Sequence, residues 1–160
     1  MKKKTIKATI SIYKDETELD VADHKLIKRA KKALKDSYSP YSNFKVGAAV
    51  LLMNGKTVVG SNQENAAYPV CICAERTALA NASSKYPKIK VAAIAITAES
   101  QHQVTNRPVS PCGTCRQYLL EVENRYQHPI RIIMQGVQGP VYTVPSAKSL
   151  LPLSFDGSQL

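Results

Sequence analysis

Polar and apolar residues alternate in two parts of the chain at the two-residue spacing of a half-buried strand. In residues 6–12, isoleucine and alanine alternate with lysine, threonine and serine. The second alternation runs from Phe44 to Leu52 and is followed by Asn54-Gly55, a dipeptide typical of two-residue hairpin turns. We therefore expect a short strand near the N-terminus and a β-hairpin whose second strand begins at Thr57.

Helical spacing of apolar residues predicts three longer helices. The first is expected to begin at a capping box in residues 17–20 and to end near Ser37. The second follows Tyr68-Pro69 and ends near residue 85, and the third runs from Cys112 to about Asn124.

Three further strands follow from the rest of the pattern. Residues 91–98 are apolar throughout, as in a strand that is covered on both faces. Residues 130–136 and 141–144 predict two more strands, and Ser146 opens a short final helix. Strands that alternate with helices indicate an α/β fold, here one sheet of about five strands with helices packed on it. At 160 residues, one domain around a single core is expected.

Composition excludes several classes of protein. With 44% hydrophobic and 21% charged residues, the chain has the composition of a globular protein and not of a disordered or fibrous one. Its apolar runs are shorter than the roughly 18 residues that a membrane-spanning helix needs. Lys7 and Lys14 interrupt what would be the apolar part of a signal peptide. We therefore expect a cytoplasmic protein with no membrane partner.

The formal net charge of +10 brings nucleic acid into consideration as a partner. In the densest basic stretch, residues 25–36, the apolar residues recur at helical spacing and place the lysines on the opposite face. Aromatic residues are only 6% of the chain, and no stretch interleaves them with basic residues. We interpret the basic face as solvated surface and expect no nucleic-acid partner.

The four cysteines form two close pairs, Cys71-Ile-Cys73 and Cys112-Gly-Thr-Cys115. Without a secretory signal, such pairs more often bind metal or do redox work than form disulfides. Three interpretations are open at this point. A redox pair has the form C-x-x-C, a structural zinc site would use all four sulfurs, and a catalytic zinc site would use three and leave one position for water.

The neighbours of the cysteines favour a catalytic site. Both pairs lie where a loop becomes a helix, and the unpaired N–H groups of a helix N-terminus suit thiolates. Glu75 follows Cys73 by two residues, and a carboxylate at this place is useful beside a catalytic metal but idle beside a structural one. Cys73-Ala-Glu75 together with Pro111-Cys112-Gly-Thr-Cys115 is the signature of zinc-dependent nucleobase deaminases, in the version with three cysteine ligands.

The sequence also closely resembles the small, homotetrameric type of cytidine deaminase. Four segments carry the resemblance in the family's order: SYSPYSNFKVGAAV (37–50), GSNQENAAYPVCICAERTALANA (60–82), SPCGTCRQYL (110–119) and SLLPLSF (149–155). The resemblance implies a three-layer α-β-α fold with a mixed sheet, one Zn²⁺ per chain, a nucleoside substrate and a homotetramer with shared active sites. It covers almost all of residues 24–156. We therefore expect residues 21–160 to form the catalytic domain, preceded by an N-terminal extension, residues 1–20, of unknown role.

Residue by residue, the resemblance makes Cys73, Cys112 and Cys115 the zinc ligands and Glu75 the proton shuttle. Cys71 is then free, and we interpret it as a small buried side chain.

The resemblance also assigns the substrate contacts. It makes Asn62 and Glu64 the partners of the ribose hydroxyls and places Phe44 against the pyrimidine. It implies that Tyr68 and Phe155 reach into the site of a neighbouring subunit. Without the resemblance, Phe44 and Phe155 would be interpreted as core residues.

Three thiolates carry more charge than a divalent ion neutralises, so the site needs positive groups nearby. Arg76 can donate hydrogen bonds to the sulfurs and withdraw charge from them. Arg116, which also follows a ligand, has the same possible role. The alternative for Arg76 is a surface position.

The predicted function is zinc-dependent hydrolytic deamination of cytidine, deoxycytidine or both, to uridine or deoxyuridine and ammonia, in pyrimidine salvage. The alternatives are a deaminase of another aminopyrimidine nucleoside, such as a nucleoside antibiotic, a deaminase of a base within a nucleic acid, and a structural zinc module with four cysteine ligands that binds nucleic acid. Asn62 and Glu64 favour a free nucleoside, because they offer polar groups to sugar hydroxyls where a polymer would present phosphates.

Overall fold

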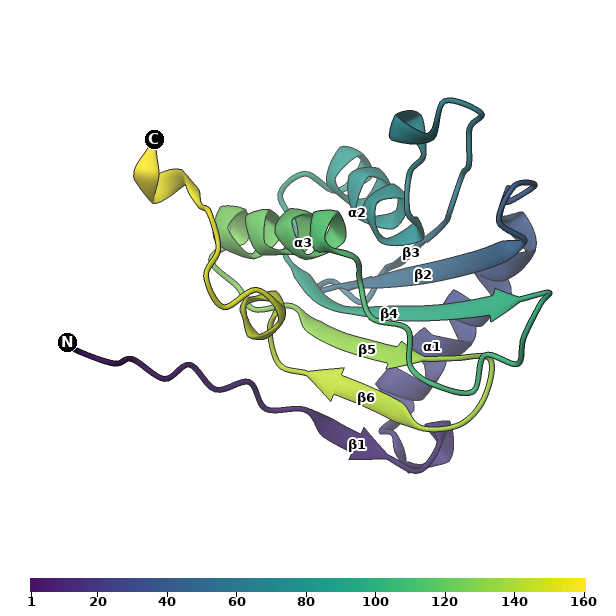
Figure 1. The fold of residues 1–160 in the computed structure, drawn as a ribbon, viewed down its shortest axis with the longest axis horizontal. Coiled ribbons are helices and arrows are strands. Elements are labelled where there is room, and N and C mark those ends of the chain that lie inside the picture. Colours follow the sequence, from purple (N-terminus) through teal and green to yellow (C-terminus); the bar gives the residue numbers. More distant parts are fainter.

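The computed structural model describes residues 1–160, apart from the side chain at position 159. Over this described length the chain forms one sheet of six strands and three α-helices (Figure 1). The strands are β1 (Ser11–Tyr13), β2 (Phe44–Leu52), β3 (Thr57–Ser61), β4 (Val91–Ser100), β5 (Arg131–Gln135) and β6 (Val141–Val144). The helices are α1 (Val21–Ala33), α2 (Ala74–Lys85) and α3 (Gly113–Tyr126), and the 3₁₀ turns are η1 (Glu16–Glu18), η2 (Leu34–Asp36), η3 (Tyr68–Val70), η4 (Ala147–Leu150) and η5 (Gly157–Gln159).

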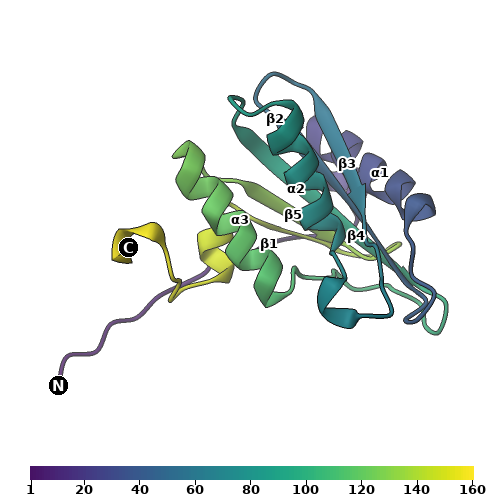
Figure 2. The same cartoon turned by 90° about the horizontal axis from the view of Figure 1, so that it is seen from above.

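The sheet is mixed and lies between two layers of helix. The strand order is β1-β6-β5-β4-β2-β3, in which β4 and β5 are parallel and the other neighbours are antiparallel. Helix α1 covers one face, and α2 and α3 cover the other (Figures 1 and 2). The predicted three-layer α-β-α fold is confirmed, with six strands in the described chain where about five were expected.

The sixth strand is the N-terminal one, and it is shorter and later than predicted. The prediction placed it at residues 6–12, but β1 begins at Ser11 and pairs with β6, with Ser11 opposite Thr143. Continuing this register would place residue 9 opposite Pro145, which has no N–H to donate to the ladder. This ends the pairing, and the side chains of residues 1–10 are exposed. The predicted boundary between an extension and a domain at residue 20 stays a prediction.

The predicted start of the first helix at residue 17 is wrong. Helix α1 begins at Val21 because Asp20 is its N-cap, and the Asp20 carboxylate accepts the main-chain N–H of Asp23 at 2.8 Å. Thr17 lies in the separate turn η1. Leu19 between them is extended and buried in the core under α1, and this contact separates the turn from the helix.

The remaining elements agree with the sequence pattern to within a few residues. The turn at Asn54-Gly55 joins β2 to β3, and Gly55 has the positive φ of 78° that this hairpin requires. Helix α2 begins at Ala74, four residues after its predicted start, because Tyr68–Val70 form the turn η3. None of the helices in the described part of the chain combines the length and apolar character that crossing a membrane requires.

The core has two halves, one on each face of the sheet. Val50, Ile94 and Ile96 belong to the half under α2 and α3, whereas Ala49 and Ala95 belong to the half under α1. All five are buried, which explains the continuous apolar pattern of β4.

Two glycines allow the helices to lie directly on the main chain of the sheet. A Cβ at Gly47 would lie 2.2 Å from the carbonyl oxygen of Ala30 in α1. A Cβ at Gly60 would lie 2.4 Å from the main-chain nitrogen of Ala78 in α2. Neither position has room for a side chain, so α1 and α2 approach the sheet as closely as backbones allow.

Candidate metal centre and active site

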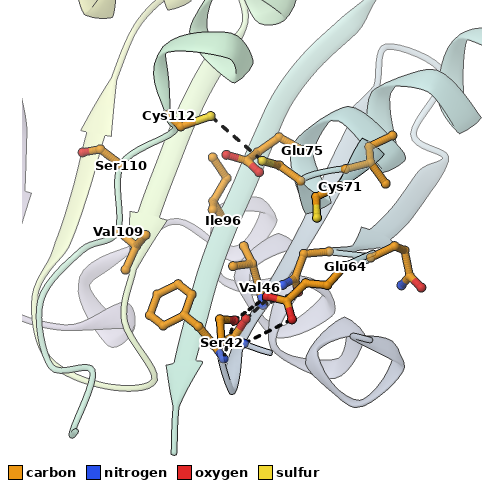
Figure 3. Close-up of a pocket in the computed structure, with 14 residues that line it drawn as sticks. Ser42, Val46, Glu64, Cys71, Glu75, Ile96, Val109, Ser110 and Cys112 are labelled. Carbon is orange, nitrogen blue, oxygen red and sulfur yellow. Dashed lines mark hydrogen bonds between the residues drawn. The ribbon is translucent and has the colours of Figure 1, made fainter. Parts of the chain in front are cut away.

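Three sulfur atoms meet at the N-terminal ends of two neighbouring helices. Cys73 is the N-cap of α2, Cys112 is the N-cap of α3, and Cys115 lies in the first turn of α3. Their Sγ atoms lie within 4.8 Å of one another, and those of Cys73 and Cys112 are 3.9 Å apart (Figure 3). The structure thus brings together the three cysteines that the sequence predicts as ligands.

The geometry and chemistry of this group fit a zinc ion. Zinc–sulfur bonds of about 2.3 Å in tetrahedral geometry place two ligand sulfurs roughly 3.8 Å apart, and the Cys73 and Cys112 sulfurs are 3.9 Å apart. Thiolates are soft ligands that select zinc over magnesium or calcium. The two helix N-termini add unpaired N–H groups and positive dipole ends, which stabilise the negative sulfurs.

Arg76 lies next to this sulfur group. Its Nη2 donates to the carbonyl oxygen of Cys71 at 2.9 Å, and its Nε is buried without a hydrogen-bond partner among the described residues. The neighbouring Cys115 sulfur, followed by Arg76 and the Cys112 thiol, lowers the pKa of the Cys73 thiol to about 5. The pKa of Cys115 is raised, first by the neighbouring Cys73 sulfur and second by burial. The donor set therefore already contains a thiolate with a cation beside it.

Glu75 is buried beside the sulfur atoms. It is the second residue of α2 and is 4% exposed. Figure 3 shows its carboxylate in the cavity, on the side of the sulfurs. Burial, with a smaller contribution from the charge of Cys73, raises the pKa of this carboxyl group. General acid–base catalysis needs a group that can both take and give a proton, and a carboxyl group with a raised pKa is suited to this.

A cavity of about 460 Å³ opens in front of the sulfur group, within the range of small-molecule sites. Its apolar walls and its polar end come from several elements. The apolar walls are Phe44, Val46, Ile72, Ile96 and Val109, the polar end is Ser42, Asn62, Gln63 and Glu64, and the inner end is Cys71, Cys73, Glu75 and Cys112. Ser110 also lines the cavity, close to Cys112 and away from Ser42 and Glu64 (Figure 3).

Apart from Phe44, sequence reasoning missed the apolar walls. Val46 and Ile96 belong to apolar strand patterns that predict burial, and nothing in such a pattern distinguishes a core face from a cavity wall. Val109 and Ser110 lie in the loop that leads to Cys112, where the sequence offered no signal.

Asn62 is held by three hydrogen bonds at the polar end. Its Oδ1 accepts from Ser37 Oγ at 2.6 Å and from the Val46 N–H at 2.7 Å, and its Nδ2 donates to the Phe44 carbonyl oxygen at 2.9 Å. Both Oδ1 lone pairs are therefore used. Within the part of the chain that the structure describes, one Nδ2 hydrogen remains for a ligand.

Glu64 is similarly fixed. Its Oε2 accepts the main-chain N–H of Tyr41 at 2.9 Å and that of Ser42 at 3.2 Å, and its Oε1 accepts the Ser42 hydroxyl. Burial acts to raise the pKa of Glu64, but the hydrogen bonds from Ser42 and Tyr41 outweigh it and the pKa is lowered. Counting only described donors, one lone pair of Oε1 remains for a ligand.

The two aromatic residues that the resemblance assigns to a neighbouring subunit lie outside this cavity. Tyr68 is 68% exposed and packs edge-to-face on Tyr41, with ring centroids 6.0 Å apart. Phe155 is 56% exposed and lies near Gln117 of α3, whose Nε2 donates to its carbonyl oxygen at 3.0 Å. Phe44, by contrast, lines the cavity.

Cys71 and Arg116 have contacts that the sequence did not predict. Cys71 is half-buried in the cavity wall, and its Sγ accepts the Asn65 N–H at 3.2 Å. The metal-binding group found among the described residues contains the other three cysteines. Arg116 donates to the main-chain oxygens of Pro111 and Leu150. Its predicted influence on the sulfurs stays a prediction.

Comparison with known proteins agrees with this geometry. The family model for the "Cytidine and deoxycytidylate deaminase zinc-binding region" matches residues 20–127. The cytidine deaminase of Halalkalibacterium halodurans is 39% identical over 135 residues, which are 84% of this chain and 95% of that protein. The cytidine deaminase of Sporosarcina psychrophila is 40% identical over 136 residues, which are 85% of this chain and 93% of that protein.

Solved structures give the same result. The crystal structure of cytidine deaminase from Burkholderia pseudomallei matches with a TM-score of 0.72 at 41% identity, over 82% of this chain and 98% of that chain. That of the Mycobacterium tuberculosis enzyme matches with a TM-score of 0.66 at 32% identity, over 86% of this chain and 99% of that chain.

The chain therefore belongs to the cytidine and deoxycytidylate deaminase family, and it contains the zinc-binding region of that family. The resemblance predicted from four sequence segments is confirmed. The family region and the group of three sulfurs together assign one zinc ion to each chain. A structural zinc module with four cysteine ligands is not favoured, because the sulfur of Cys71 contacts Asn65 and lies outside the metal-binding group.

Proposed function

We propose that this protein catalyses the hydrolytic deamination of cytidine, deoxycytidine or both, giving uridine or deoxyuridine and ammonia. Cys73, Cys112 and Cys115 hold the zinc ion, and Glu75 moves the protons. One observation carries the proposal: a buried carboxyl group lies beside three converging sulfurs at the inner end of a nucleoside-sized cavity, in a chain of this family.

The chemistry divides between the metal and the protein. When bound, a zinc ion with three protein ligands supplies Lewis acidity, which lowers the pKa of water toward about 7. Glu75 takes a proton from the water that adds to C4 of the cytosine ring and gives it to N3. It then takes the second proton from the hydroxyl group now on C4 and gives it to the amino group, so that the C4–N4 bond breaks, ammonia leaves and C4 becomes a carbonyl. One carboxylate suffices because these transfers are sequential, and the raised pKa of Glu75 suits both directions of transfer.

The rest of the cavity orients the substrate. Phe44 and the other apolar walls enclose the pyrimidine, and the loss of water around it strengthens the electrostatic effects of the metal centre. Arg76 offsets the negative charge of the sulfurs, and its buried Nε and its effect on the Cys73 pKa support this role.

Asn62 and Glu64 support recognition of a single sugar hydroxyl. Asn62 offers one remaining N–H, and Glu64 offers one remaining lone pair within the described structure. A hydroxyl group is one donor and one acceptor, so this pair satisfies one hydroxyl and leaves nothing for a second. We infer that this is the 3′ hydroxyl, which cytidine and deoxycytidine share, and that the enzyme accepts both nucleosides.

The proposal includes a homotetramer with shared active sites and a cytoplasmic location. Tyr68 and Phe155 support the assembly, because both are large, exposed and outside the cavity of their own chain. In the tetramer each would contact the substrate cavity of a neighbour. The measurement is the molar mass in solution by light scattering, for which we expect four chains.

The activity is tested by adding cytidine to purified protein and following the ultraviolet change that accompanies uridine formation. We expect turnover, loss of turnover with a chelator, and its return with zinc. A metal-replete preparation that leaves both cytidine and deoxycytidine unchanged would rule the proposal out.

A further inference from the structure

Arg116 connects two parts of the chain that are far apart in sequence. Its Nε donates to the carbonyl oxygen of Pro111 at 2.8 Å, and its Nη1 donates to that of Leu150, the last residue of η4, at 3.1 Å. We call Arg116 with these two acceptors the Arg116 clasp. We propose that Arg116 is a positioning residue, and that the clasp holds the peptide before Cys112 so that its sulfur is in place for metal binding.

Cys112 is the metal ligand with the least support from packing. It is exposed, whereas Cys115 is fully buried and Cys73 is half-buried. As the N-cap of α3, Cys112 makes no capping hydrogen bond with its side chain. Few side-chain contacts therefore fix its sulfur, and its position depends on the two peptide groups that flank it.

Arg116 binds both of these peptide groups. Its main-chain N–H donates to the Cys112 carbonyl oxygen at 2.9 Å, and its side-chain Nε donates to the Pro111 carbonyl oxygen. The Pro111 carbonyl and the Cys112 nitrogen belong to one planar peptide unit. Fixing that plane and the next one limits the rotation about Cys112 that would turn its sulfur away from Cys73.

The far end of the clasp is also anchored to α3. The Glu123 carboxylate accepts the main-chain N–H of Ala147 at 2.8 Å and the hydroxyl of Ser146 at 2.8 Å. Glu123 lies about two helical turns after Arg116, so η4 is held along α3 at two points (Figure 2). The Leu150 carbonyl is therefore a fixed acceptor, and the C-terminal turn becomes part of the support of the metal centre.

The guanidinium group suits this task because it is a rigid planar fork that presents several donors at once. A lysine at the same place would keep the charge but could not reach two separated carbonyls with the same geometry. The difference between arginine and lysine at position 116 therefore distinguishes a positioning role from an effect of positive charge on the sulfurs.

The proposal rests on the zinc site of the proposed function, but its test needs no substrate. Zinc affinity is measured by chelator competition for the wild type, Arg116→Lys, Arg116→Ala and, as the control on the same helix, the exposed Arg125→Ala. We expect both Arg116 variants to bind zinc about 10- to 100-fold more weakly and the control to stay within about twofold. Thermal unfolding of the chelator-treated proteins checks that the variants are folded. If Arg116→Ala does not fold, the zinc affinities of the wild type and Arg116→Lys are compared instead.

Two results would overturn the clasp. One is wild-type zinc affinity in the folded Arg116 variants. The other is wild-type affinity in Arg116→Lys with weak binding in Arg116→Ala, because charge without the two-carbonyl geometry would then suffice. If both Arg116 variants bind zinc more weakly and Arg125→Ala does not, but the wild type does not deaminate cytidine, the clasp stands and the proposed function fails.

Discussion

Cys73 and Cys112 are separated by 39 residues, yet their sulfur atoms lie 3.9 Å apart. Each is the N-cap of a different helix, and both helices lie on the same face of the sheet. The metal centre is therefore built where two helices begin side by side. Glu75 lies in the first turn of α2, two residues after Cys73, and this short separation brings it to the same place.

Replacing Glu75 by glutamine should remove proton transfer and leave the metal in place. The amide is close in size to the carboxyl group but cannot take or give the protons, so we expect turnover of cytidine to fall by about 10² to 10⁴. Zinc content and turnover are measured on the same preparation, with the exposed Glu121→Gln as the matched control. Near wild-type turnover in zinc-loaded Glu75→Gln would remove Glu75 from the mechanism.

The two cysteines of the first pair should differ in their effect on zinc. Cys71→Ser should keep one zinc per chain and most activity, because the Cys71 sulfur lies outside the metal-binding group and contacts Asn65. Cys73→Ser should lose the metal, because a ligand of the group is gone. The metal content of the two variants decides between three and four sulfur ligands. Equal loss of zinc in both variants would restore the interpretation with four.

Sugar analogues test the single-hydroxyl inference. We expect kcat/KM for cytidine and deoxycytidine to agree within about tenfold, and that for 2′,3′-dideoxycytidine to be lower on the order of 10- to 100-fold, because Asn62 and Glu64 would be left without a partner. The corresponding variant, Glu64→Gln, should reduce this discrimination. Equal kcat/KM values for all three nucleosides would show that the pair does not recognise a 2′ or 3′ hydroxyl.

Glu123 is expected to be important for stability and not for chemistry. Its buried carboxylate accepts from the N–H groups of Ile130 at 2.6 Å and Ala147 at 2.8 Å and from the Ser146 hydroxyl at 2.8 Å. In Glu123→Gln one oxygen can still accept both N–H groups and the amide N–H₂ faces the Ser146 hydroxyl, but the hydrogen bonds lose their ionised acceptor, which should reduce the free energy of unfolding by about 1–3 kcal/mol. Denaturant unfolding measures this, with Glu121→Gln on the exposed side of α3 as the control. Equal free energies of unfolding for the two variants would contradict a stabilising role for the hydrogen bonds of Glu123.

Gly47→Ala should destabilise the packing of α1 on the sheet. The added Cβ would lie 2.2 Å from the main-chain oxygen of Ala30, so the helix must move away from β2. We expect a loss of about 1–3 kcal/mol in the free energy of unfolding. The control is Gly157→Ala, whose Cβ meets no described atom within 4 Å. Thermal unfolding of the two variants measures this difference. Equal unfolding midpoints would contradict the close approach of Gly47 to Ala30.

The group of three sulfurs could be predicted from sequence because its signals are local. The cysteine pairs, the prolines before them and the Ala-rich pattern after Cys73 all lie within a few residues, and together they locate two helix starts. The continuous apolar run of β4 likewise predicted burial on both faces, and Ile94 and Ala95 indeed belong to opposite halves of the core.

Features that depend on distant parts of the chain could not be predicted in this way. The contact of Arg116 with Leu150 joins residues 34 positions apart, and nothing near Arg116 indicates which carbonyl it will meet. The predicted start of α1 was wrong because Thr17 and Asp20 are both favourable N-cap residues, and the local sequence does not decide between them. The burial of Leu19 favours Asp20, and this is a tertiary contact.

The glycine at position 60 has a consequence for how catalysis can be tuned. A side chain there would lie 2.8 Å from the carbonyl oxygen of Ala74, the residue between Cys73 and Glu75. The turn that carries Cys73 and Glu75 is thus in direct contact with the strand through main-chain atoms, with no side chain between them that could change rotamer. Small displacements of α2 would move both groups as one rigid unit, so Gly60, which has no functional group, sets their alignment for the proposed reaction.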